Sequence, residues 1–211
     1  MKKLAVFDLD GTLIDSISDI ICAVNFVRRQ AGLQTLGNEE ITKCVGDGAA
    51  LLVERTVPQG NMPHKQALEL FKKYYHEHSV DHTCLYDNVK EGLAKLCEQG
   101  YLLCVVSNKP TELCLNVLKI FEIDSYFTEI VGGNSGFALK PSPDALLFLK
   151  EKYGAQVCFM CGDHYTDLES GRRAEFKSIR ATYGFGDPRG ESSDFTAHSF
   201  DEVCTIIMTN S

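Results

Sequence analysis

The sequence lacks a net positive charge, a long apolar run and any internal repeat. Its 21 Lys and Arg residues are outnumbered by 29 Asp and Glu residues, which gives a formal net charge of -8 at pH 7. Because phosphate-rich surfaces attract basic proteins, we expect no nucleic-acid partner and no acidic membrane partner. The apolar stretch 4–7 is too short for a secretory signal, and no window reaches the length of a membrane span.

The nine cysteines lack the regular spacing of a disulfide framework. Several lie in apolar runs, where a thiol packs like a small apolar side chain, so we predict a reduced, cytoplasmic protein. Cys158 and Cys161 have the spacing of a redox or zinc motif. On a strand, however, side chains three positions apart point to opposite faces, and we therefore predict two buried core thiols.

Short apolar runs alternate with amphipathic stretches along most of the chain. The runs cover residues 4–7, 102–106, 129–131, 157–160 and 178–182. Continuous apolarity is typical of strands buried on both faces, and with helices between them the runs predict an α/β fold with a doubly wound parallel sheet. Asn88, Ser142 and Ser199 are candidate caps for helices that reach Gln99, Tyr153 and Met208.

Residues 16–82 interrupt this alternation because they contain no strand-like run. Apolar side chains repeat there at three and four positions, as in Ile17, Ile20, Val24 and Val27. We therefore predict an all-helical domain over residues 16–82, inserted after the first strand. A length of 211 residues is sufficient for this domain and for a larger core made of residues 1–15 and 83–211.

Three polar clusters each follow directly on an apolar run. Asp8, Ser107 and Asp163 come after the runs that begin at residues 4, 102 and 157. The carboxyl ends of parallel strands meet at one edge of a sheet, and ligands bind there. We expect these side chains to converge on a single site.

Asp8 is the candidate nucleophile of a phosphoryl-transfer site. Its carboxylate is ionised at neutral pH, and an aspartyl-phosphate intermediate divides a slow displacement into two easier ones. Two anions must then meet, which requires a cation, and Mg²⁺ prefers carboxylate, phosphate and water oxygens. Asp8 and Asp163 are the expected metal ligands, together with the main-chain carbonyl of Asp10 and, directly or through water, Asp167.

The remaining candidates complete the chemistry of a phosphatase site. Asp10 is expected to protonate the leaving oxygen and then deprotonate water, with a pKa raised by neighbouring carboxylates. Lys140 would pair with Asp8 and the phosphoryl oxygens as a point charge. Ser107 and main-chain amides around Leu9 and Asn108 would form a phosphate cradle.

The order of these segments resembles the haloacid dehalogenase superfamily, and most closely its phosphoglycolate phosphatases. The residues that carry the resemblance are Asp8 to Ser16, Ser107 to Thr111, Ile130 to Gly133, Lys140 to Asp144, Gly162 to Asp167, and Thr182 to Gly184, with Val45 to Gly48, Leu51, Glu54 and Arg55 in the insertion. The resemblance implies a Rossmann-like core, a helical cap that closes over the site, Mg²⁺ dependence and release of inorganic phosphate from a small phosphorylated metabolite, with 2-phosphoglycolate the expected substrate. It also implies substrate contacts from Gly11, Thr12 and Gly46. We expect a monomer or a homodimer, and the resemblance does not decide between them.

Two positions depart from the family pattern, and several activities stay open. His164 replaces a small hydroxyl residue, and Glu175 replaces a frequent glycine. A cap arginine could read a substrate carboxylate, and Arg55 is the candidate, although a surface salt bridge explains it equally well. A dehalogenase would not need an acid at Asp10, because a halide leaves without a proton, so the presence of Asp10 favours a phosphatase. A pyrophosphatase, nucleotidase, sugar phosphatase or β-phosphoglucomutase would keep all the motifs. The non-enzyme alternative is a catalytically silent phosphate-binding module, but loss of catalysis usually removes a motif carboxylate and none is missing here.

Overall fold

A six-stranded parallel sheet forms the centre of the larger domain. The computed structural model describes residues 1–211, and the strand order is β5-β4-β1-β6-β7-β8. The strands are β1 (Lys3–Phe7), β4 (Tyr101–Val106), β5 (Glu129–Val131), β6 (Val157–Gly162), β7 (Lys177–Ala181) and β8 (Phe195–Ala197). The chain runs from β1 outward to β5 and then returns to the other side of β1 with β6. The predicted doubly wound parallel sheet is therefore confirmed, and its switch point lies at β1.

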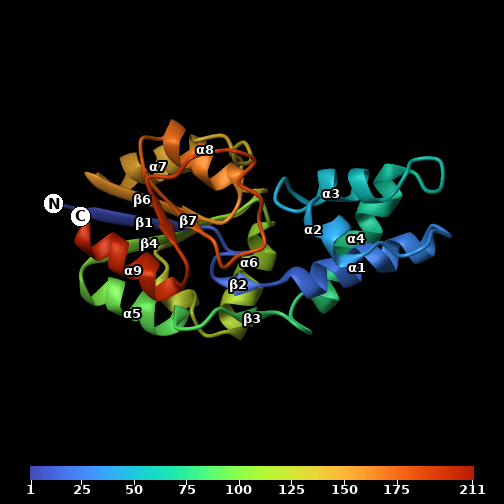
Figure 1. Ribbon diagram of the computed structural model, residues 1–211, viewed down its shortest axis with the longest axis horizontal. Coiled ribbons are helices and arrows are strands. Elements are labelled where there is room, and N and C mark those ends of the chain that lie inside the picture. Colours follow the sequence, from blue (N-terminus) through green and yellow to red (C-terminus); the bar gives the residue numbers. More distant parts are fainter.

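Helices cover both faces of this sheet (Figure 1). Ala5 and Phe7 of β1 face a core cluster that includes residues of α5 (Val89–Glu98), α6 (Thr111–Ile120) and α9 (Phe200–Thr209). Leu4 and Val6 face the opposite cluster, which includes α7 (Asp144–Tyr153), while α8 (Tyr165–Arg173) packs on β6 and β7. Successive side chains of a strand point to opposite faces, so the continuous apolar run of β1 is buried on both sides.

Of the three candidate caps, only Ser199 is confirmed, because α7 has Pro143 at its N-cap position and no side-chain cap from Ser142. The Ser199 side chain accepts a hydrogen bond from the Glu202 N–H, as expected of an N-cap. The helix α7 ends at Gly154, which adopts the left-handed conformation. Asn88 is not a side-chain cap, because its backbone is left-handed and its amide donates to Asp201 instead. Strand β8 was not predicted, since Phe195–Ala197 is short and has no apolar run.

Four helices lie between two short strands that connect them to the sheet domain. The antiparallel pair β2 (Ile14–Asp15) and β3 (Cys84–Leu85) carries the chain out of the sheet domain and back. The helices between them are α1 (Ile17–Gln30), α2 (Asn38–Thr42), α3 (Ala49–Thr56) and α4 (His64–His78), and they lie beside the sheet domain with a core cluster of their own (Figure 1). None of the helices combines the length and apolarity needed to cross a bilayer.

Two sequence details have a structural explanation. Cys158 and Cys161 are both free and buried, and they belong to clusters on opposite faces of the sheet, which confirms the core-thiol interpretation. Glu175 has φ 59°, a left-handed conformation that favours glycine. The backbone thus keeps the conformation of the glycine that the resemblance leads one to expect at this position.

Candidate active site

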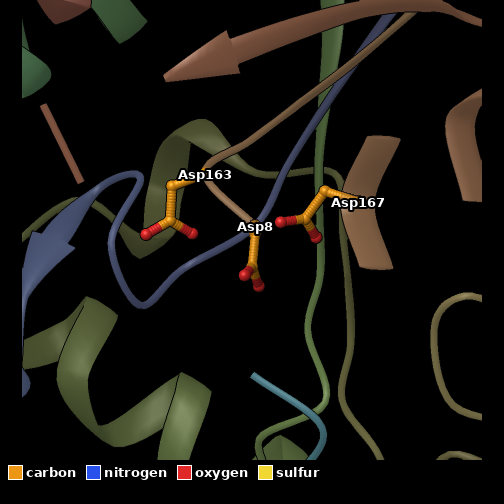
Figure 2. Close-up of side chains that lie close together, drawn as sticks. All are labelled: Asp8, Asp163 and Asp167. Carbon is orange, nitrogen blue, oxygen red and sulfur yellow. The ribbon is translucent and has the colours of Figure 1, made fainter. Parts of the chain in front are cut away.

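Three buried carboxylates meet at the carboxyl edge of the sheet. Asp8 follows β1, Asp163 follows β6, and Asp167 lies in the first turn of α8. One carboxylate oxygen of each lies within 4.8 Å of those of the other two. Asp8 lies between the other two side chains in Figure 2. The convergence expected from the ends of parallel strands is therefore present.

Lys140 neutralises part of this negative charge. Its Nζ lies 2.9 Å from Asp8 Oδ1 and donates to Asp167 Oδ1 at 2.6 Å and to the Val106 carbonyl at 2.6 Å. The contact with Asp8 is a buried ion pair. Burial raises the pKa of Asp8 to about 6, with Asp167 and Asp10 adding to the effect and Lys140 opposing it.

Gly11 lets the Asp163 carboxylate approach the turn that follows β1. Gly11 has φ 80°, and a Cβ at this position would lie 1.8 Å from Asp163 Oδ2. That oxygen also accepts a hydrogen bond from the Gly186 N–H at 2.7 Å. Burial, with the charges of Asp167 and Asp8, raises the pKa of Asp163 well above its ordinary value. Close packing thus holds Asp163 where its charge is costly in the absence of a cation.

The donor set at this edge fits a hard divalent cation. Asp8 and Asp163 are both buried and each offers a carboxylate oxygen to the same point. A cation between them would offset the burial and the mutual repulsion that together raise both pKa values. The Asp167 oxygens, by contrast, already accept from Lys140 and from the His164 N–H at 3.0 Å. Asp167 therefore fits a supporting role beside the metal better than direct ligation.

The Asp10 side chain points to a different set of partners. Its Oδ1 accepts from Ser16 Oγ at 2.6 Å and from Lys109 Nζ at 2.8 Å. The group of three carboxylates that could hold a metal ion does not include it. The hydrogen-bonding neighbours of Asp10 are thus a hydroxyl and an ammonium group, and the Asp8 carboxylate lies near enough to feel its charge. Any metal contact from Asp10 would have to come from its main-chain carbonyl.

Main-chain amides near the carboxylates are available to an anion. The N–H groups of Leu9, Asp10 and Asn108 donate no hydrogen bond within the protein. The Gly11 N–H, in contrast, donates to the Ile14 carbonyl at 2.8 Å, and the Thr12 N–H to the Leu9 carbonyl at 3.2 Å. The turn itself uses these two amides, so the expected substrate contacts from Gly11 and Thr12 are not supported.

A cavity that opens to solvent lies between the helical insertion and the sheet domain. It is lined by Asp8, Asp10, Gly46, Ser107, Asn108 and Asp163 among the predicted residues, and also by Ile20, Val45, Gly48, Ala49, Leu52, Phe71, Lys72, Tyr75, Lys109, Pro110, Leu113, His164, Phe185 and Gly186. Sequence reasoning did not assign Lys72, Tyr75 or Lys109. Lys109 could have been identified from the sequence, because it directly follows Ser107 and Asn108. Tyr75 could not, because it occupies an apolar position of a helix.

The cavity is closed at one side by contacts between the two domains. The Asn108 side-chain amide donates to the Gly46 carbonyl at 3.0 Å and to the Lys140 carbonyl at 3.0 Å. Gly46 has φ 112°, and a Cβ there would lie 2.4 Å from the His164 ring. His164 is buried, and burial lowers its pKa to about 4, which leaves the ring neutral near pH 7. Gly46 and His164 therefore form a close contact at the rim of the cavity.

Arg55 does not line the cavity and forms a salt bridge, which favours the second of its two interpretations over contact with a substrate carboxylate. Its guanidinium donates to Asp47 Oδ2 at 2.5 Å, and Arg189 of the sheet domain donates to the same oxygen at 2.9 Å. The Tyr165 hydroxyl donates to Asp47 Oδ1 at 2.5 Å. Although burial opposes it, these hydrogen bonds lower the pKa of Asp47 to about 2. Arg55 thus belongs to an ion cluster that joins the two domains.

Comparisons with known proteins agree with this geometry. The family described as haloacid dehalogenase-like hydrolase matches residues 5–181. A Haemophilus influenzae protein named phosphoglycolate phosphatase is 36% identical over 220 residues, covering 97% of this chain and 98% of the relative. An Aliivibrio fischeri protein of the same name is 33% identical, covering 97% and 96%. The crystal structure of a predicted phosphoglycolate phosphatase from Haemophilus somnus superposes with a TM-score of 0.91 at 30% identity, covering 97% of each chain.

Proposed function

The chain belongs to the haloacid dehalogenase-like hydrolase family and is a phosphoric monoester hydrolase, and we propose that it hydrolyses 2-phosphoglycolate through a phosphorylated Asp8. The observation that carries the proposal is the buried Asp8 carboxylate, placed between Asp163 and the Lys140 ammonium group. The helical segment 16–82 would act as the cap over this site. Relatives named phosphoglycolate phosphatase support the choice of substrate.

The proposed reaction is two successive displacements at phosphorus. A carboxylate oxygen of Asp8 attacks phosphorus while the ester oxygen leaves, and that oxygen takes a proton from Asp10. Asp10, now a carboxylate, removes a proton from water, and the water oxygen attacks phosphorus and releases inorganic phosphate. Asp8 is regenerated as the leaving group. Lys140 and the free amides of Leu9 and Asn108 stabilise the charge on the equatorial oxygens.

Mg²⁺ is the proposed cofactor. Asp8 and Asp163 would hold it with the main-chain carbonyl of Asp10, while Asp167 orients Lys140 and the His164 amide beside it. When bound, the ion supplies positive charge that lets the phosphate dianion approach the Asp8 carboxylate. Three buried carboxylates with only one ammonium group between them support this assignment.

Lys72 is the proposed partner of the substrate carboxylate. It lies on α4 and lines the cavity, and no ion pair occupies its ammonium group. Lys109, the other lysine of the lining, is already paired with Asp10. A substrate with a second anionic group needs such a cation opposite the phosphate site, and Arg55 lies outside the cavity.

Lys72→Met is expected to raise KM for 2-phosphoglycolate by about tenfold, because a charge-assisted hydrogen bond contributes about 1.5 kcal/mol or more. KM for phenyl phosphate, which has no carboxylate, should change little. Lys73→Met is the matched control, since Lys73 is exposed on the same helix and does not line the cavity. Equal changes for the two substrates would remove Lys72 from carboxylate recognition.

A phosphate-release screen tests the proposed activity directly. The purified protein with Mg²⁺ would be offered 2-phosphoglycolate, sugar phosphates, nucleotides and pyrophosphate. We expect the highest kcat/KM for 2-phosphoglycolate. A higher value for another class would assign the chain to a sugar phosphatase, nucleotidase or pyrophosphatase, and conversion between sugar phosphates would assign it to a mutase. Failure to release phosphate from any of them would contradict the proposed function.

A further inference from the structure

We propose that Lys109 is a positioning residue that fixes the general acid Asp10 and makes its placement depend on contact with the cap residue Tyr75. The inference rests on the proposed function, because it takes Asp10 as the acid that protonates the leaving oxygen. Its own evidence is a chain of contacts from α4 of the cap, through the loop after β4, to the turn after β1.

Lys109 has two polar side-chain partners, one in each domain. Its Nζ donates to Asp10 Oδ1 at 2.8 Å and to the Tyr75 hydroxyl at 2.9 Å. The Lys109 side chain is 4% exposed, and Tyr75 is buried as well. An ammonium group so far removed from water depends on the partners that the protein supplies. The position of Nζ is therefore set jointly by Asp10 and by the cap.

The donors around Asp10 leave one of its oxygens free for chemistry. Ser16, at the start of the cap segment, donates to the same Oδ1 at 2.6 Å. No side chain or main-chain amide donates to Asp10 Oδ2, and Asp10 lines the cavity. With Oδ1 fixed by Lys109 and Ser16, Oδ2 is the oxygen presented to a leaving group. A rotation of the carboxylate would break both hydrogen bonds.

Tyr75 connects this arrangement to closure of the cap. Its hydroxyl lies on α4, and the Lys109 Nζ also lies 5.0 Å from the centre of its ring. When the cap moves away, Lys109 loses its hydroxyl partner and the face of an aromatic ring, and its ammonium group gains access to water. Lys109 would then hold Asp10 less firmly, so the acid is positioned only while the cap covers the substrate.

The dependence of rate on the leaving group separates positioning from a structural role. An alkyl phosphate such as 2-phosphoglycolate releases a strongly basic oxygen that needs a proton, whereas 4-nitrophenyl phosphate releases a stable anion. We expect Lys109→Met to lower kcat/KM for the best alkyl phosphate of the screen by about 10²-fold, the lower end of what a positioned acid contributes. For 4-nitrophenyl phosphate the loss should stay below about tenfold.

Further variants guard against a simple folding defect. Tyr75→Phe removes only the cap hydroxyl and should shift the ratio of the two kcat/KM values in the same direction by a smaller factor. Lys109→Arg keeps the charge, so the ratio of its two kcat/KM values should lie close to that of the unsubstituted protein. Lys119→Met is the control, because Lys119 is exposed on α6 and outside the cavity. Thermal unfolding of each variant shows whether it is folded.

Two outcomes would overturn the inference. Equal losses for both substrates in Lys109→Met and an unchanged ratio in Tyr75→Phe would assign Lys109 a structural role, with the phosphatase activity of the unsubstituted protein still in place. An unsubstituted protein that hydrolyses neither substrate would instead contradict the proposed function on which the inference rests.

Discussion

Asp8→Asn is expected to lower kcat for phosphate release by about 10⁶-fold, the scale of loss when a hydrolase is deprived of its covalent nucleophile. The amide has nearly the shape of the carboxylate but attacks phosphorus poorly. The fold should persist, because the substitution removes a carboxylate whose ionisation burial disfavours. Burial raises the pKa of Asp8 to about 6. Phosphate release under single-turnover conditions measures the loss, and circular dichroism reports the fold.

The matched control for this variant is Asp87→Asn. Asp87 is exposed, lies in the turn before α5 and does not line the cavity, so its kcat should equal that of the unsubstituted protein. Retention of more than about one per cent of the activity by folded Asp8→Asn would reject Asp8 as the nucleophile.

Removal of divalent metal is expected to abolish turnover, and added Mg²⁺ should restore it. The reason is electrostatic, because without the ion a phosphate dianion must approach Asp8 while Asp163 and Asp167 lie close by. Activity is measured after chelation with EDTA and after stepwise addition of Mg²⁺. A second readout is independent of turnover, since Mg²⁺ should raise the unfolding temperature of the metal-free protein by relieving the repulsion between these carboxylates.

Asp163→Asn tests the metal assignment by changing a proposed ligand instead of removing the ion. It should raise the Mg²⁺ concentration needed for half-maximal activity by about tenfold to 100-fold and weaken the thermal stabilisation by Mg²⁺. An undiminished rate in excess chelator would refute the metal's part in the reaction. Full thermal stabilisation of Asp163→Asn at the same Mg²⁺ concentrations would remove Asp163 from the ligand set.

The placement of the carboxylates at one edge of the sheet could be predicted, because it follows from the order of strands and polar residues in the sequence. Asp8 and Asp163 each follow a buried strand, and strands of one parallel sheet end at the same edge. The apolar runs were sufficient to identify five of the six strands of the sheet. Strand β8 escaped because its position depends on pairing with β7 and its sequence, Phe195–Ala197, has no apolar run.

The contacts between cap and core could not be predicted in the same way. Arg55 was a reasonable candidate because the resemblance places it in the cap, but the resemblance does not say how the cap side chains are oriented on the core. Two of the three partners of Asp47, Tyr165 and Arg189, lie 118 and 142 positions further along the chain. Tyr75 and Lys109 likewise lie 34 positions apart in different domains. Such pairs follow from tertiary packing and leave no periodic signal in the sequence.

The stereochemical course at phosphorus tests the central proposal, transfer of the phosphoryl group to Asp8, most directly. A phosphomonoester made chiral at phosphorus with sulfur and oxygen isotopes would be hydrolysed in isotopically labelled water, and the configuration of the released thiophosphate determined. Two in-line displacements, first by Asp8 and then by water, predict net retention. Net inversion would show that water attacks the substrate directly and would contradict the account.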